Sequence, residues 1–171
     1  RDSSTSRGLG DVYKRQNYNI MNRIEFSQQL IVQRESAGIG KNELCRLTGF
    51  TFNQLQYLEK ASNNYNINLV CTYLAAIKSK MVLLKGKKRK VICDFEGFAD
   101  WMTSTRKLEY TQRALADKAG ITYVTIANIE SKKHIVRIDT LLKIVDVLGY
   151  TIKIENNEHF GPSSNREKRT V

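Results

Sequence analysis

Apolar and polar positions alternate at helical spacing over the stretch TQRALADKAGITYVTIANIES. Leu115 and Ala119 lie four residues apart on one helix face, and Gly120 then permits the left-handed backbone that ends a helix. Beyond this glycine, Ile126 and Ile129 share the inner face of a second helix. The pattern therefore predicts two short helices joined by a tight turn.

The outer side of the second predicted helix carries small and polar residues. Thr122 is a suitable cap for its first turn, because the hydroxyl can accept from a free backbone N–H. Val124, Asn128 and Ser131 then project away from the apolar face. A helix with such an outer stripe, held from behind by a preceding helix, can enter a groove, as in the helix-turn-helix arrangement.

These residues also carry a family resemblance, since Tyr110 to Gly149 resembles the lambda-repressor-like, or XRE-type, helix-turn-helix domain. The matching features are Thr111-Gln112, Leu115-Ala116, Gly120-Ile121-Thr122, Thr125-Ile126, Ile129-Glu130, Thr140-Leu141-Leu142 and Leu148-Gly149. The chain departs from the family at Lys132, where glycine is usual, and at Val136, where proline is usual. Both departures concern the loop after the second helix rather than the fold.

The N-terminal half repeats the pattern 71 positions earlier, without a gap. One offset keeps apolar, glycine and capping positions together, which indicates an internal duplication. Thr51 and Gln54 add a capping-box pattern to the earlier copy. The aligned pairs are Leu44 with Leu115, Gly49 with Gly120, Thr51 with Thr122, Leu55 with Ile126, Leu58 with Ile129, Glu59 with Glu130, Ile67 with Ile138 and Val70 with Leu141.

The second copy is expected to begin with a helix over Asp94–Thr105. Phe95, Phe98 and Met102 lie on one face of this helix. The same offset aligns Trp101 with Leu30, which predicts that the indole joins the core rather than a stacking site.

Short β-favouring segments follow both copies, at Met81–Leu84 and Tyr150–Glu155. A lone strand has unpaired edges and needs a partner. Three pairings are open. The two strands can pair within one chain, or pair across a homodimer as in some antitoxin-like relatives of the family. Met81–Leu84 can also form a hairpin with Lys90–Cys93 around Gly86.

These features predict a mainly α fold with two tandem five-helix lambda-repressor-like helix-turn-helix domains. Each domain is followed by a short strand, and the strands can pair as a small sheet. The expected boundaries are a disordered or non-native leader over 1–20, a divergent first domain over 21–77, a strand and basic linker over 78–93, a second domain with its strand over 94–155, and a disordered tail over 156–171.

The net charge of +11 is concentrated in one segment. Residues 78–93 hold seven Lys and Arg and no acid, whereas acids and bases balance over 94–150. Charge alone therefore indicates a nucleic-acid partner only weakly. The run Lys85–Lys90 is either a solvated turn or linker, or a linker that tracks phosphates between two docked units.

Other functional classes find little support in the sequence. The chain has no apolar run of membrane-spanning length, and no membrane association is expected. Cys45, Cys71 and Cys93 are too far apart for a zinc site that His134 or His159 could complete, so buried thiols in a reducing cytoplasm are expected. We find no nucleophile–base pair and no phosphate-cradling glycine loop, so neither an enzyme nor a cofactor is predicted.

The resemblance assigns phosphate contacts in the second copy. Gln112 opens one helix and Thr122 and Thr125 open the next, and helix N-termini favour anions. Lys132 and Lys133 follow the second helix and would neutralise backbone charge. The alternative for Thr125, as for Asn128, is an ordinary polar residue exposed on a surface helix.

Tyr123, Val124 and Asn128 match the base-reading positions of the family. Asparagine can form paired hydrogen bonds with adenine, and valine can touch a thymine methyl group. The corresponding residues of the first copy, from which weaker DNA contacts are expected, are Lys41, Phe52, Asn53 and Tyr57.

The sequence thus predicts a sequence-specific regulator of transcription that binds double-stranded DNA in the cytoplasm, at the nucleoid. A repressor is the expected role, and an antitoxin that binds a toxin protein is a special case. Two recognition helices, in one chain or two, would lie about 34 Å apart on successive major-groove turns. The alternative is a protein–protein interaction module on the same scaffold without DNA binding.

Overall fold

The computed structural model describes residues 20–157. The predicted leader, except for Ile20, and the predicted tail beyond Asn157 lie outside the described residues. Within the described part, the fold is mainly helical with a small antiparallel sheet.

The described elements alternate between helical groups and strands. Four helices precede a β-hairpin, and four more follow it before the last strand. The prediction of five helices in each unit is therefore not confirmed, because the described residues hold four in each half. In chain order the elements are α2 (Arg23–Ser36), α3 (Lys41–Thr48), α4 (Phe52–Glu59), α5 (Ile67–Ala76), β1 (Ser79–Lys85), β2 (Lys88–Ile92), α6 (Phe95–Glu109), α7 (Gln112–Ala119), α8 (Tyr123–Glu130), α9 (Ile138–Val147) and β3 (Thr151–Asn156).

Side-chain caps fix where several helices begin. The Thr51 hydroxyl accepts from the Gln54 N–H at 3.1 Å, and Gln54 Oε1 accepts from the Thr51 N–H at 2.9 Å, which confirms the predicted capping box of α4. The Thr122 hydroxyl accepts from the Thr125 N–H at 3.3 Å and caps α8. Asp94 caps α6 through the Gly97 N–H at 2.7 Å.

Three helices of the first half correspond to three of the second at a constant offset. Helices α3, α4 and α5 begin and end 71 residues before α7, α8 and α9; for the first pair, from Lys41 to Gln112, 112 − 41 = 71. The first helices differ, because Arg23 opens α2 and Phe95 opens α6, and 95 − 23 = 72. The segment between α2 and α3, which includes Gly38 at φ +70°, absorbs the extra residue.

This shift corrects one predicted alignment. At an offset of 72, the buried residue that corresponds to Leu30 is Met102, whereas Trp101 corresponds to Gln29. The prediction that Trp101 is a core residue is confirmed. Its ring packs edge-on against Tyr150, with the ring centroids 5.1 Å apart.

The three strands form one antiparallel sheet in the order β2-β1-β3. β1 pairs with β3 from Ser79↔Asn156 to Leu84↔Thr151, so the two strands predicted from sequence pair within one chain. β1 also forms the hairpin with β2, which turns at Gly86 with φ +58°. The two pairings predicted within the chain therefore occur together, and both edges of β1 are occupied. The segment predicted as a strand and basic linker is this hairpin.

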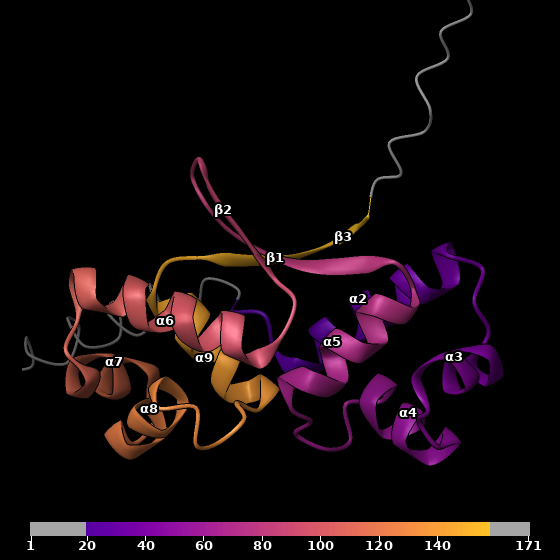
Figure 1. The fold of residues 1–171 in the computed structure, drawn as a ribbon, viewed down its shortest axis with the longest axis horizontal. Helices are drawn as coiled ribbons and strands as arrows, with labels where there is room; N and C mark the ends of the chain where they lie inside the picture. Colours follow the sequence, from indigo (N-terminus) through magenta and orange to yellow (C-terminus); the bar gives the residue numbers. More distant parts are fainter. Residues whose placement is uncertain (1–19, 158–171) are drawn as a thin grey trace, which may run out of the picture.

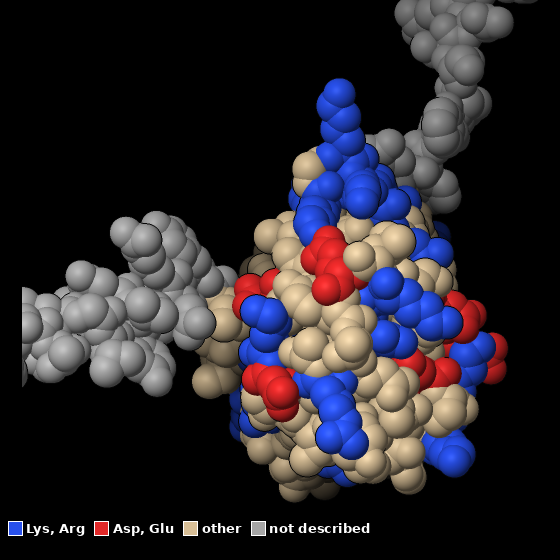
Figure 2. Space-filling model, turned by 90° about the vertical axis from the view of Figure 1, so that its left-hand side faces the viewer, with Lys and Arg blue, Asp and Glu red and all other residues tan. Residues whose placement is uncertain are grey.

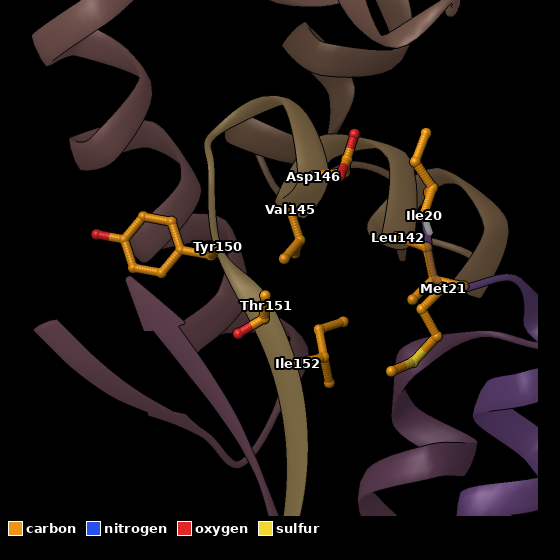
Figure 3. Close-up of a pocket in the computed structure, with 8 residues that line it drawn as sticks. All are labelled: Ile20, Met21, Leu142, Val145, Asp146, Tyr150, Thr151 and Ile152. Carbon is orange, nitrogen blue, oxygen red and sulfur yellow. The ribbon is translucent and has the colours of Figure 1, made fainter. Parts of the chain in front are cut away.

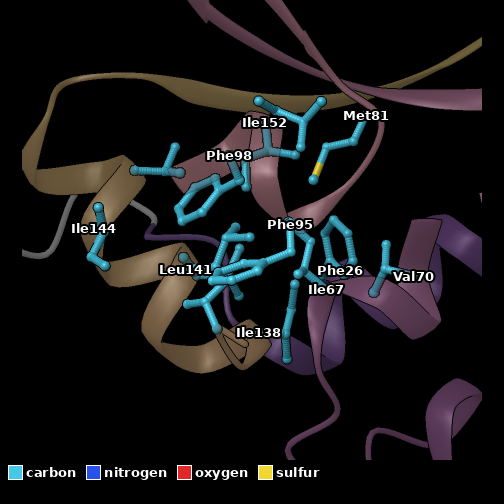
Figure 4. Close-up of a cluster of buried hydrophobic side chains, with 14 of the residues drawn as sticks. Phe26, Ile67, Val70, Met81, Phe95, Phe98, Ile138, Leu141, Ile144 and Ile152 are labelled. Atoms are coloured by element: carbon cyan, nitrogen blue, oxygen red, sulfur yellow. The ribbon is translucent and has the colours of Figure 1, made fainter. Parts of the chain in front are cut away.

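Both halves contribute to one hydrophobic core under the sheet (Figure 4). Phe26 and Ile67 come from the first half, and Phe98 and Leu141 come from the second. The inward side chains of β1 and β3, such as Ile152, close the core from above. The two halves therefore share one hydrophobic core and do not form two separate cores.

The arrangement puts α4 and α8 on the side of the molecule away from the sheet (Figure 1). α3–α4 lie at the lower right of this view and α7–α8 at the lower left, while the β1–β2 hairpin projects from the top. Whatever binds α4 and α8 therefore approaches from the side opposite the hairpin.

Candidate nucleic-acid interface

α7 and α8 form the predicted pair of helices around a tight turn. Gly120 takes φ +66° at the end of α7, and the Ile121 N–H donates to the Ala116 carbonyl at 3.0 Å. Leu115 is buried on α7, while Ile126 and Ile129 are buried on α8. The inner faces predicted from the apolar spacing are thus confirmed, and α8 is held from behind by α7.

The outer face of α8 is accessible. Tyr123 and Val124 keep 46% and 49% of their surface exposed. Thr122 is exposed, and Thr125 and Asn128 are half-buried. The predicted phosphate-contacting threonines and base-reading residues therefore lie together along one side of α8, where a duplex groove could receive them.

Arg113, which the sequence reasoning missed, joins this surface from α7. Its guanidinium lies over the Tyr123 ring, 4.8 Å from the centroid. The two side chains border an open groove of about 880 Å³ that Lys107 and Thr111 also line. A basic side chain in the first turn of α7, directly after Gln112, was the available signal. The stack orients a permanent positive charge beside the outer face of α8.

The Gln112 side chain, for which a phosphate contact is predicted, forms a hydrogen bond within the protein. Its Nε2 donates to Glu130 Oε2 at 2.6 Å, and Arg106 binds the same carboxylate through Nε and Nη2. The amide is therefore bound within the protein and joins α7 to α8. The free backbone N–H groups in the first turn of α7 can bind an anion without the Gln112 side chain.

The two lysines after α8 lie in different environments. Lys132 Nζ is 3.0 Å from Asp100 Oδ1 on α6, and this hydrogen bond raises the pKa of Lys132. Lys133 is exposed and has no ion pair among the described residues. Both lysines are predicted to contact the DNA backbone. The amine of Lys132 is bound to Asp100 of α6, whereas the amine of Lys133 is not.

The departures from the family pattern are accommodated in the loop after α8. Lys132 adopts φ +59°, the left-handed conformation that glycine supplies more readily. The corresponding residue of the first half, Ala61, adopts φ +53°. Val136 is buried, and its carbonyl accepts from the Ile67 N–H at 3.0 Å, which joins this loop to the first half.

The first half has the same internal ties and a different outer face. Arg34 Nε donates to Glu59 Oε1 at 2.6 Å, and Lys41 Nζ lies 3.8 Å from Glu59 Oε2. Like Gln112, Lys41 thus approaches the buried carboxylate. Phe52 and Tyr57 are 44% and 51% exposed on α4. Asn53 is exposed beside them, so this predicted group also lies on one surface.

The densest basic segment lies away from α8. Figure 2 shows the Lys and Arg side chains gathered at the top of the molecule, where the hairpin of Figure 1 projects, above a surface of mixed charge. Lys85 is held against the second half, where Nζ donates to the Leu148 carbonyl at 3.0 Å and to Glu109 Oε1 at 3.2 Å. The hairpin is thus not placed to track phosphates between α4 and α8.

A cavity at the junction of the halves does not resemble a ligand site. It measures about 100 Å³ and lies between the segment at Met21 and the start of β3 (Figure 3). Asp146 is the only carboxyl group in its lining, and burial raises the pKa of this group. Small-molecule sites are typically at least about 300 Å³, and a lone carboxyl group offers no acid–base pair.

The cysteines only partly match the expected buried thiols. Cys45 and Cys71 are half-buried, but Cys93 is exposed just after β2. Among the described residues, no three His, Cys, Asp or Glu side chains gather as a metal site. None of the helices in the described part of the chain is long and apolar enough to cross a membrane.

A comparison with protein families finds a match within the second half. The family model described as Helix-turn-helix matches residues 105–154, which run from the end of α6 into β3. No curated protein and no solved structure matches the chain. Residues 105–154 are thus similar to helix-turn-helix segments of the XRE, or lambda-repressor-like, type.

Proposed function

We propose that the chain is a sequence-specific regulator of transcription that reads double-stranded DNA through α8. The observation that carries the proposal is that α8 has one buried face and one exposed face. Ile126 and Ile129 anchor it to the core, whereas Tyr123 and Val124 remain exposed at its N-terminal end. Recognition helices of this motif place their first residues against base edges in the major groove.

The roles proposed for individual residues follow from their positions. Thr122 and Thr125, together with the N-terminus of α7, contact phosphates and set the orientation of α8. Val124 touches a thymine methyl group, and Asn128 binds adenine through two hydrogen bonds. Arg113 and Lys133 add charge that is indifferent to sequence.

We further propose that the first half is a divergent tandem copy of the same motif. The shared bounds of α3–α5 and α7–α9, at 71 residues apart, support a duplication. Repression follows if occupation of the operator excludes RNA polymerase. An antitoxin role is a special case, which additionally requires a toxin that binds this chain.

A second candidate function is a protein-interaction module that does not bind DNA. It is favoured by the apolar residues exposed on α3 and α4, since Leu47, Phe52 and Tyr57 all keep about half of their surface exposed. The balanced charge of residues 94–150 favours it too. The two functions differ in salt dependence, because DNA affinity falls steeply with salt and an apolar protein interface is much less sensitive.

Selection from random duplex DNA tests the proposed function. The full chain is used at about physiological salt, where non-specific binding is weak. We expect one enriched sequence, with preference at one base pair relaxed by Asn128→Ala. The matched control is Asn68→Ala, an exposed asparagine on α5 that should leave the enriched sequence unchanged. If no sequence is enriched, DNA reading by this chain is refuted and a protein partner becomes the better explanation.

A further inference from the structure

Corresponding residues of the two halves pair with each other in the sheet. Val82 of β1 faces Lys153 of β3, and the two are 71 residues apart in the chain. Two antiparallel segments that pair at equivalent positions are related by a two-fold axis through that pair. The sheet therefore defines an approximate two-fold axis that passes between Val82 and Lys153.

A second pair lies at the other end of the molecule. Asn66, before α5, forms an antiparallel bridge with Arg137, before α9, again 71 residues later. The flanking hydrogen bonds are reciprocal: the Ile67 N–H donates to the Val136 carbonyl at 3.0 Å, and the Ile138 N–H donates to the Tyr65 carbonyl at 2.8 Å. Exchanging the halves turns one bond into the other, so the same axis continues from the sheet to these loops.

The axis relates α4 to α8, and both helices lie on the side away from the sheet (Figure 1). Duplex DNA has two-fold axes of its own, which relate successive major-groove turns on one face. Resting on the proposed function, we infer that one chain occupies a complete two-part operator, and that its two half-sites differ in sequence. α8 reads one half-site and α4 reads the other.

A second chain is not required for this arrangement. β1 is the central strand, so the pairing that would otherwise join two chains is satisfied within one. One outer edge of the sheet is β2, which carries Lys88, Arg89 and Lys90. Repeated positive charge on an edge strand opposes pairing with another copy. The pairing of β1 with β3 thus holds both helices within one chain.

The two helices present different side chains at each outward position. Phe52 and Tyr123 are exposed to nearly the same degree, so the geometry is shared while the chemistry differs. Asn53 can bind adenine where Val124 can only touch a methyl group. The corresponding outward pairs are Phe52 with Tyr123, Asn53 with Val124, Gln54 with Thr125 and Tyr57 with Asn128 on α4 and α8, and Lys60 with Ser131 at the residue that follows each helix.

Because the half-sites differ, the operator has a direction. A homodimer of identical helices selects a palindrome, whereas this chain selects two unlike half-sites whose centres are about one helical turn apart. The bound protein then has one orientation, with its N-terminal half over a defined side of the site.

The test is selection of random duplex DNA by the full chain, followed by native mass spectrometry of the complex. We expect one chain per duplex and an asymmetric two-part site. Asn53→Ala should relax preference in one half-site and Asn128→Ala in the other, each by roughly 5- to 100-fold in discrimination at one base pair.

An exchange variant makes the prediction sharper. Its five substitutions, which give α8 the outer face of α4, are Tyr123→Phe, Val124→Asn, Thr125→Gln, Asn128→Tyr and Ser131→Lys. Thr125→Gln pairs Thr122 with the residue type that completes the capping box at Thr51, so α8 keeps its start signal. The variant should select a palindrome, and its urea midpoint confirms folding.

The outcomes separate this inference from the proposed function. A palindrome bound by two wild-type chains, or a single half-site that depends on Asn128 but not on Asn53, overturns the inference alone. No enrichment by the wild-type chain overturns both. If the exchange variant is unfolded, the two alanine variants decide, because the inference requires their effects to fall in different half-sites.

Discussion

Arg106 on α6, which is buried, and Glu130 at the end of α8, which is half-buried, form a bidentate ion pair. Arg106 Nε donates to Glu130 Oε1, and Nη2 lies 3.2 Å from Oε2. In the first half, Arg34 binds Glu59 with the corresponding distances of 2.6 and 3.3 Å. Burial alone lowers the pKa of Arg34, but the hydrogen bond and the charge of Glu59 outweigh it, so the pKa is raised. The ion pairs thus join the candidate recognition helices to the first helix of each half, α4 to α2 and α8 to α6.

Removing one partner of such a pair should be costly. Glu130→Ala leaves the buried Arg106 guanidinium without its carboxylate partner, and we expect a loss of about 3–5 kcal/mol in the free energy of unfolding. Urea unfolding followed by circular dichroism measures the loss. The control is the double variant Arg106→Met/Glu130→Leu, which removes both charges and should recover most of the stability. A double variant as unstable as the single one would show that the ion pair itself, rather than an orphaned charge, sets the cost.

The left-handed backbone at Lys132 predicts that glycine is favoured there. Lys132→Gly and Lys132→Ala both remove the amine that contacts Asp100, so their difference isolates the backbone. An L-residue in this conformation is strained by the clash of its Cβ, and glycine relieves that strain. We expect the melting temperature of Lys132→Gly to exceed that of Lys132→Ala by roughly 2–4 °C. Equal melting temperatures would mean that the loop relaxes without cost.

Cys71 should make stability depend on alkaline pH. Burial, with smaller contributions from Asp94 and Cys93, raises the pKa of this thiol to about 12 from its ordinary 9.0. The folded chain keeps the proton that the unfolded chain releases, so the stabilisation is complete below pH 9 and is lost as the pH rises toward about 12. The urea midpoint should therefore fall above pH 9, and the fall should be shallower in Cys71→Ala. An unchanged slope in that variant would assign the fall to other groups.

Substitutions at Arg113, beside α8, and at Lys88, on the β1–β2 hairpin, show which of these two basic surfaces binds DNA. Arg113→Ala should weaken binding about equally for all DNA sequences and reduce the slope of log affinity against log salt by about one. Lys88→Ala, on the hairpin at the opposite side of the molecule, should leave that slope unchanged. Fluorescence anisotropy at several salt concentrations measures both. A reduced slope for Lys88→Ala would place DNA against the hairpin.

Much of the fold could be predicted from local signals. The helix boundaries around Gly120 and Thr122 depend on backbone freedom and capping, which act within a few residues. The alignment of α2 with α6 could not be predicted from a constant offset. The extra residue between α2 and α3 shifts α2 by one position relative to α6, so Leu30 corresponds to Met102.

The sequence supplies the residues of the candidate site as a prediction, but it does not show all the contacts that hold them. Tyr123, Val124 and Asn128 were found from helical spacing and the family resemblance. The bond from Gln112 to Glu130 was missed, because it depends on a carboxylate 18 residues away and on its burial beside Arg106. A signal was present, since Arg34 and Glu59 recur as Arg106 and Glu130. Single-sequence spacing does not show which charges become buried together.

The most direct measurement is a hydroxyl-radical footprint of the full chain on the duplex that selection enriches. We predict two protected backbone patches on one face of the DNA, with centres about 10 base pairs apart, as expected for two reading helices on successive major-groove turns. Asn128→Ala should leave both patches in place at saturating protein, because it removes a base contact and not a phosphate contact. A single protected patch, or patches on opposite faces of the duplex, would contradict the arrangement of α4 and α8 described above.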